Sequence, residues 1–137
     1  MTAGLARLKT RADFVRVAAG RRRAVRPSFI LQAAARRVEA GSGETVRVGF
    51  TASRKVGNAV VRNRAKRRLR AIAAEILPRR GRPGTDYVLV ARAMSHERPY
   101  AQLLADLEAA LRQLDRQKAG GSPRDEAAPP YRAAEEE

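Results

Sequence analysis

The chain has 137 residues, which suits one domain with a substantial hydrophobic core and leaves little room for a second. Lysines and arginines number 29 against 14 aspartates and glutamates, and a net charge of +15 repels itself in a compact fold unless a polyanion neutralises it. No apolar run is long enough for a membrane span or typical of a secretory signal, and cysteine is absent. We therefore expect a cytoplasmic protein without disulfides or thiolate metal sites.

A short helix is predicted first, from a capping-box-like start at Thr10 and Asp13 to a stop at Gly20. Residues 28–35 are apolar and partly β-branched, as expected of a strand, and residues 45–53 alternate between apolar and polar side chains, as expected of another. Because one loop joins these two segments, we predict that they form an antiparallel pair. The apolar side of the second strand should comprise Val46, Val48, Phe50 and Ala52.

A long helix is predicted from Asn58, a typical N-cap residue, to Leu77, just before Pro78. Its apolar residues recur at helical spacing along one stripe, which comprises Val61, Ala65, Leu69, Ile72 and Ile76. Residues 87–91 form a short apolar run typical of a buried strand. A last helix should begin at Pro99 and pack an apolar face on the sheet; that face comprises Tyr100, Leu103, Leu104, Leu107, Leu111 and Leu114.

The composition changes after Lys118, where glycine, serine, proline, alanine and glutamate replace bulky apolar residues. Such a segment cannot recover its ordering entropy by burial. We therefore predict one domain over residues 1–118 and a disordered tail over residues 119–137.

The segment from Thr45 to Ala74 contains no acidic residue and nine basic ones. With the apolar stripe of the long helix turned to the core, the rest of that helix surface is almost uniformly cationic. Like charges one turn apart, such as Arg62 and Lys66, oppose helix formation, and bound phosphates would relieve the repulsion. The nine residues are Arg47, Arg54, Lys55, Arg62, Arg64, Lys66, Arg67, Arg68 and Arg70.

A basic helix can also be no more than a solvated face, but so long an acid-free run favours nucleic-acid binding. The start of the helix adds to the attraction, because free backbone N–H groups at Gly57 and Asn58 and the positive end of the helix dipole lie beside Arg54 and Lys55. A phosphate could be held there.

The chain offers little for catalysis on its own. Its one histidine, His96, is more typical of a loop residue than of a catalytic base, and its acids are scattered. We therefore expect no catalytic residue in this chain and no self-contained nuclease. Phe14 has two interpretations, as a core residue of the first helix or as a base-stacking residue, and the pattern does not decide between them.

The segment from Arg47 to Arg70 closely resembles the signature of the bacterial ribonuclease P protein subunit. Its specific parts are Arg62-Asn63-Arg64 and Lys66-Arg67-Arg68, one after the other on the predicted long helix. The resemblance extends upstream to Arg11-Ala12-Asp13-Phe14 and Gly20 and downstream to the segment 86–92. It covers roughly residues 8–115 and leaves out only the tail.

The resemblance implies an α+β fold, a two-layer αβββαβα sandwich like one domain of a small-subunit ribosomal protein, with a left-handed βαβ crossover around the long helix. An extra short strand would lie near Arg23 to Arg26. In that family a catalytic RNA removes the 5′ leader of precursor tRNA with the help of bound Mg²⁺, and the protein assists the binding of substrate and metal. The activity would thus be that of an endoribonuclease holoenzyme whose catalytic centre and metal ions belong to the RNA. The implied partners are ribonuclease P RNA and precursor tRNA, with no membrane and no required protein partner.

By the same resemblance, two sets of side chains would contact RNA. The catalytic RNA would bind Arg54, Lys55, Arg62, Asn63, Arg64, Lys66, Arg67, Arg68 and Arg70. The single-stranded leader would lie in a cleft lined by Phe14, Ile30, Thr51 and Ser53. Relatives often have aromatic residues where this chain has Ala18 and Gln32, so leader binding here should rely less on stacking and more on charge.

The charge pattern alone permits a second hypothesis, a ribosomal or RNA-chaperone protein that binds RNA outside any enzymatic complex. Sequencing the RNA that copurifies with the chain separates the two hypotheses, because ribosomal RNA would favour the second.

Overall fold

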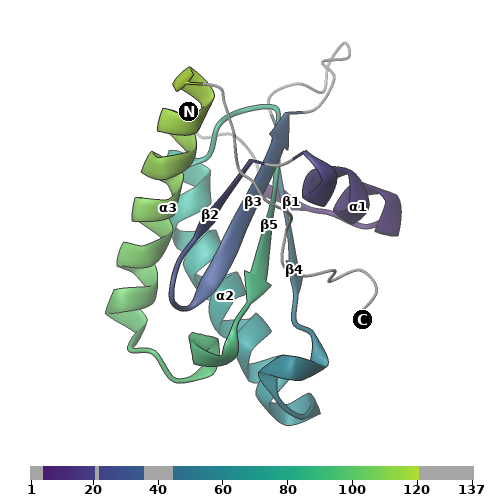
Figure 1. Ribbon diagram of the computed structural model, residues 1–137, viewed down its shortest axis with the longest axis vertical. Helices are drawn as coiled ribbons and strands as arrows, with labels where there is room; N and C mark the ends of the chain where they lie inside the picture. Colours follow the sequence, from purple (N-terminus) through teal and green to yellow (C-terminus); the bar gives the residue numbers. More distant parts are fainter. Residues whose placement is uncertain (1–4, 21, 36–44, 121–137) are drawn as a thin grey trace.

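The structure, a computed structural model, describes residues 5–20, 22–35 and 45–120. Within these residues the chain forms one mixed sheet, three α-helices and two short 3₁₀ helices, η1 and η2 (Figure 1). In chain order the elements are β1 (Leu5–Arg7), α1 (Arg11–Ala19), β2 (Arg22–Val25), β3 (Phe29–Ala35), β4 (Val46–Thr51), η1 (Arg54–Val56), α2 (Ala59–Arg80), β5 (Thr85–Ala91), η2 (Ala93–His96) and α3 (Tyr100–Gly120).

The strand order in the sheet is β1-β4-β5-β3-β2. β4 is parallel to β1 and β5, whereas β3 is antiparallel to β5 and β2. The prediction that the strands at 28–35 and 45–53 pair with each other is therefore wrong, because β5 lies between β3 and β4. β5 is suited to this central place, since all seven of its residues are buried.

The two edges of the sheet are short strands. β2 is the extra strand expected near Arg23 to Arg26, and it begins one residue earlier. β1 pairs with β4 in parallel and has no counterpart among the predicted elements. Three residues carry no periodicity of their own, so β1 depends on the neighbouring strand for its structure.

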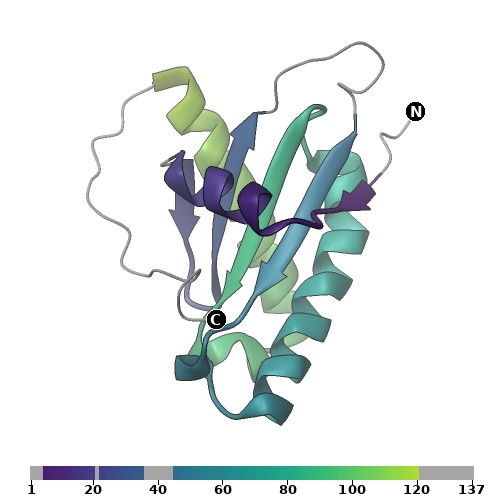
Figure 2. The ribbon, with the colours of Figure 1, turned by 90° about the vertical axis from the view of Figure 1, so that its right-hand side faces the viewer.

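The helices lie on both faces of the sheet. α2 and α3 cover one face, and α1 crosses the other (Figure 2). β4 and β5 are parallel neighbours, and α2 joins them on the face opposite α1. In Figure 2, where α1 is in front and α2 lies behind the sheet, both strands point downward and β5 lies to the left of β4. This arrangement makes the crossover left-handed, against the usual preference. The expected α+β fold is confirmed. The sheet with α2 and α3 forms the two expected layers, and α1 covers part of the remaining face.

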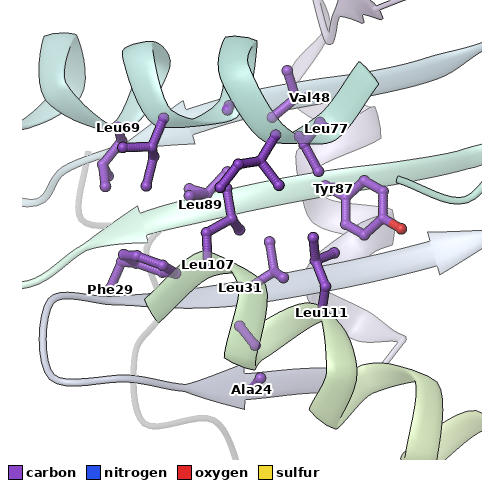
Figure 3. Close-up of a cluster of buried hydrophobic side chains, with 14 of the residues drawn as sticks. Ala24, Phe29, Leu31, Val48, Leu69, Leu77, Tyr87, Leu89, Leu107 and Leu111 are labelled. Atoms are coloured by element: carbon purple, nitrogen blue, oxygen red, sulfur yellow. The ribbon is translucent and has the colours of Figure 1, made fainter. Parts of the chain in front are cut away.

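The larger hydrophobic core fills the space between the sheet and the helix pair α2 and α3. Leu69 and Leu77 from α2 meet Leu107 and Leu111 from α3 over the side chains of β3 and β5 (Figure 3). The predicted stripe of α2 is confirmed, since four of its five residues are buried and Val61 packs against the same core at a half-buried position. This burial is what turns the remaining surface of α2 outward.

Two predicted details of the helices are wrong. α2 continues past Pro78 to Arg80, because Ile76 and Leu77 hold its last turn in the core and the proline removes a single backbone donor there. Tyr100 does not belong to the buried face of α3. Its side chain is 39% exposed, and its hydroxyl donates to Glu75 Oε1 at 3.1 Å.

α1 is held by fewer contacts than the other two helices. It begins as predicted, where Thr10 Oγ1 accepts from the Asp13 N–H at 3.1 Å, and ends at Gly20. Val17 is its one fully buried residue, and it packs with Leu8 and three strand residues in a small second cluster. The predicted boundary between a domain at 1–118 and a tail at 119–137 stays a prediction, because residues 121–137 lie outside the described part and α3 runs to Gly120.

Leu69→Ala tests the packing of α2 on the sheet. Leu69 is fully buried, so its truncation should lower the free energy of unfolding by about 2–5 kcal/mol, measured by urea denaturation. Val60→Ala is the control on the same helix, because Val60 is 75% exposed and its truncation should change stability by less than about 0.5 kcal/mol. Equal effects of the two substitutions would contradict the assigned orientation of α2.

Candidate nucleic-acid interface

The outward surface of α2 carries most of the predicted RNA-contacting residues. Asn63, Arg64, Arg67 and Arg70 are exposed, and the other three on the helix, Arg62, Lys66 and Arg68, are half-buried. In the described part of the chain, no carboxylate forms an ion pair with any of these six cations. Within residues 5–20, 22–35 and 45–120, no acidic side chain therefore neutralises the charge on α2.

Two of these arginines also bond to the backbone. Arg62 NH1 donates to the Gly57 carbonyl at 3.0 Å, across the start of α2. Arg68 donates twice, from NH1 to the Ser95 carbonyl at 3.0 Å and from NH2 to the Arg98 carbonyl at 2.7 Å. The Arg68 guanidinium thus ties α2 to η2 and to the segment before α3. Sequence reasoning could not distinguish this arginine from its neighbours, because its partners lie 27 and 30 residues away.

The connection from β4 to α2 is a tight turn that carries two exposed cations, Arg54 and Lys55. Ser53 Oγ accepts from the Lys55 N–H at 3.3 Å and caps η1, and Asn58 Oδ1 accepts from the Val61 N–H at 3.0 Å and caps α2 as predicted. Gly57 between them has φ +151°, a conformation that favours glycine. Arg54 and Lys55 are exposed on this turn.

Arg70 lies over an aromatic ring of β4. Its Cζ is 5.8 Å from the centroid of the Phe50 ring, within reach of a cation–π interaction. Phe50 itself packs against the larger core. This contact places the Arg70 guanidinium beside β4.

Arg47 differs from the other eight cations of the acid-free segment. Its Nε and NH2 donate to the two carboxylate oxygens of Asp86 at 2.8 and 2.7 Å, and its NH2 lies 3.5 Å from Asp13 Oδ1. The hydrogen bond and charge of Asp86 raise the pKa of Arg47 above its usual value. The positive charge of Arg47 is therefore paired with an acidic side chain inside the fold. Asp86 is the register partner of Arg47 on β5, which no pattern within one strand reveals.

Three of the four predicted leader residues lie on the α1 face of the sheet, and we call Phe14, Ile30 and Thr51 the leader surface. Thr51 and Ile30 flank Val90 in the register of β4, β5 and β3. The Thr51 hydroxyl oxygen is buried and has no hydrogen-bond partner among the described residues, and Ile30 is only 7% exposed. Ser53 lies beyond the end of β4, where it caps η1.

The Phe14 ring lies directly on the backbone of β4. A Cβ added to Gly49 would sit 2.6 Å from Phe14 Cε2, closer than two carbon atoms approach. Phe14 is half-buried against the smaller cluster, so part of its ring is packed and part is accessible. Phe14 thus packs in the fold as the core interpretation expects, and its base-stacking role stays a prediction. Of the two departures from the family pattern, Gln32 is buried in β3 on this face and Ala18 is half-buried on α1.

The remaining candidates for chemistry do not form a site. His96 lies in η2 with Nδ1 3.0 Å from the Ala93 carbonyl oxygen. The described residues contain no group of three or more histidines and acids that could hold a metal ion, so they do not fit a protein-held Mg²⁺ site. No helix in the described segments is long and apolar enough to cross a membrane.

A mixed sheet with an unneutralised cationic helix on one face and a partly accessible aromatic residue on the other defines a basic RNA-binding protein of the α+β class. Comparison with known proteins identifies the family. The family model for ribonuclease P matches residues 3–115. The ribonuclease P protein component of Paramagnetospirillum magneticum is 52% identical over 114 residues, which cover 83% of this chain and 86% of that protein. The same component of Ruegeria pomeroyi is 51% identical, covering 82% of this chain and 89% of that protein.

Solved structures agree with these relatives. The RNase P protein of Staphylococcus aureus superimposes with a TM-score of 0.63 at 26% identity, covering 78% of this chain and 93% of that one. The RNase P protein of Thermotoga maritima has the same fold, with a TM-score of 0.61 at 24% identity and coverage of 80% and 96%. The chain belongs to the bacterial ribonuclease P protein family. It is the protein component of a ribonucleoprotein endoribonuclease of tRNA processing, which decides against the ribosomal or RNA-chaperone hypothesis.

Arg64→Gln and Arg68→Gln should separate the two kinds of arginine on α2. Arg64 is exposed and has no ion pair with a described residue, so its loss should weaken RNA binding and reduce the slope of log K against log salt by about one. Arg68 is held by two carbonyls, so its loss should lower the melting temperature and leave that slope nearly unchanged. The measurements are RNA binding over a salt series and thermal unfolding. A reduced slope for Arg68→Gln with no loss of stability would contradict the structural role of Arg68.

Proposed function

We propose that the chain binds the catalytic RNA of ribonuclease P through the outward surface of α2 and Arg54 and Lys55, and receives the 5′ leader of precursor tRNA on the leader surface. In this way it assists removal of the leader to give the mature 5′ end of tRNA. The observation that carries the proposal is the placement of two RNA-suited surfaces on opposite faces of one sheet (Figure 2).

The α2 surface suits the folded RNA. Its cations are carried on one helix and have no carboxylate partner among the described residues, so phosphates need not displace an acidic side chain to reach them. Arginine adds planar, bidentate bonding to phosphate oxygens. A structured RNA offers phosphates at fixed positions, which such an array can match.

The leader surface suits a single strand. Unpaired nucleotides bind where an aromatic ring offers a stacking face and small polar groups lie beside it. Phe14 supplies a half-buried ring, and Thr51 supplies a half-buried polar residue whose hydroxyl oxygen is itself buried and has no hydrogen-bond partner in the described part of the fold. Because β4 carries Thr51 and leads straight into Arg54 and Lys55, a strand on this surface would run toward the RNA held by α2.

The chemistry would then belong to the RNA. The described residues provide no nucleophile held by a base and no cluster of metal ligands, so their part is to bind and orient. Mg²⁺ would be held through the RNA and would supply activation of the attacking water when bound. The cytoplasm, where tRNA precursors are processed, is the expected location, and no further protein partner is required.

Reconstitution with a bacterial ribonuclease P RNA tests the proposal directly. The chain should stimulate cleavage of precursor tRNA at low magnesium, because its fixed cations replace part of the charge screening that the metal otherwise provides. Cleavage is followed by gel electrophoresis of end-labelled precursor tRNA. Absence of stimulation, with the RNA active at high magnesium, would contradict the proposal.

Phe14→Ala tests the leader surface. The loss of its ring should weaken binding of precursor tRNA with a leader by about five-fold or more and leave mature tRNA unaffected, since one base–aromatic stack contributes about 1–3 kcal/mol. Affinities of the reconstituted holoenzyme for the two tRNAs are measured by equilibrium binding. If the two affinities fall equally, or if the protein unfolds, Phe14 serves only the core.

A further inference from the structure

Four charged side chains form a compact cluster between α1 and the sheet. Asp13 and Arg16 come from α1, Arg47 from β4 and Asp86 from β5. Arg16 NH2 pairs with Asp86 Oδ2, Arg47 binds both oxygens of Asp86, and Asp13 Oδ1 lies 3.5 Å from Arg47 NH2 and 4.0 Å from Arg16 NH2. We call these four residues the α1 clamp.

The α1 clamp is well suited to fix the orientation of α1 relative to the sheet. The Asp86 side chain has 0% exposure, and the two arginines beside it are 29% and 40% exposed. Partly buried ion pairs add little net stability, because desolvation offsets the attraction. A carboxylate held at both oxygens by a planar guanidinium, however, allows only one relative orientation of the groups. Arg16 NH1 also donates to the Ala35 carbonyl at 3.4 Å, which joins α1 to the end of β3.

α1 has little else to set its position. It is nine residues long, and Val17 is its only fully buried residue. The apolar cluster beneath it is small, and apolar contact is not directional. The clamp therefore supplies the directional contacts that join Asp13 and Arg16 of α1 to β4 and β5.

The clamp lies next to the ring of the leader surface. Phe14 follows Asp13 in the chain, and the Phe14 ring rests on Gly49, which lies two residues after Arg47 on the same face of β4. There is no free space between the ring and the strand, so a small rotation of α1 displaces the ring.

We propose that Asp86, Arg47 and Arg16 are positioning residues for leader recognition, and that they act by holding the Phe14 ring in place on β4. This inference rests on the proposed function, because it concerns how the leader surface discriminates between precursor and mature tRNA. Arg47 thereby differs in role from the exposed cations of its segment, such as Arg64 and Arg67, which are proposed to face the RNA.

Asp86→Asn gives the sharpest test, because positioning and charge predict opposite signs. The substitution raises the positive charge of the protein, so a purely electrostatic role would strengthen binding of the leader and raise the preference for precursor over mature tRNA. Positioning predicts that the preference of the reconstituted holoenzyme for precursor over mature tRNA falls by about five-fold or more, as for loss of one stacked ring. The cleavage rate constant at saturating precursor should stay unchanged.

Arg16→Gln supplies a second variant in case Asp86→Asn does not fold. Arg16 is exposed, and Asp86 keeps its two bonds to Arg47, so the fold should persist. Positioning predicts that Arg16→Gln lowers the preference for precursor tRNA in the parent chain and has no further effect in a Phe14→Ala background. Lys9→Gln is the charge-matched control, since Lys9 is exposed just before α1 and lies outside the clamp; its preference should equal that of the parent.

Three outcomes would overturn the inference: an unchanged or increased preference in folded Asp86→Asn, an effect of Arg16→Gln that persists in the Phe14→Ala background, or an equal loss with Lys9→Gln. Failure of the proposed function is distinct. In that case the parent chain itself would not stimulate cleavage or prefer precursor tRNA.

Discussion

The structure depends on the two-sided character of α2. One side of the helix is apolar and packs on the sheet, and the other side carries cations with no acid among them. Repulsion between those cations opposes the helix, and burial of Leu69, Ile72 and Ile76 must outweigh it. The fold thus keeps a charge array that isolated helix propensity would not support, and a bound polyanion would relieve the remaining repulsion.

The sheet links this array to the opposite face. β4 contributes Val48 and Phe50 to the core beneath α2, and Arg47, Gly49 and Thr51 to the face beneath α1. Its end leads through η1 to the first turn of α2. One strand therefore connects the surface proposed for the folded RNA with the surface proposed for the leader.

Local patterns predicted most of the fold. The caps at Thr10 and Asn58, the stripe of α2 and the two long strands depend on near neighbours in the chain, and they are confirmed. Strand pairing was the main error, because the loop between β3 and β4 favoured a hairpin while the insertion of β5 depends on contacts distant in sequence. The left-handed crossover came from family resemblance and has no local signal.

The sequence predicted which residues make up the candidate site, but not which of them form hydrogen bonds or ion pairs inside the fold. The acid-free run identified the cations of α2, yet it could not separate Arg47, which pairs with Asp86, or Arg68, which bonds to the segment before α3. The partners of Arg47 and Arg68 are distant in sequence and come near these arginines only in the folded chain. Arginines of the same segment therefore differ in their contacts: Arg47 and Arg68 bond within the fold, whereas Arg64 and Arg67 are exposed.

Cleavage of RNA by a tethered hydroxyl-radical source tests the central claim, that the outward surface of α2 faces the RNA. The chain has no cysteine, so Ala71→Cys on α2 and Ala105→Cys on α3, both at exposed alanines, give matched single attachment sites for an iron chelate. In the complex with ribonuclease P RNA, the account predicts strong local cleavage of the RNA from position 71 and little from position 105. Cleavage from position 105 alone would contradict it.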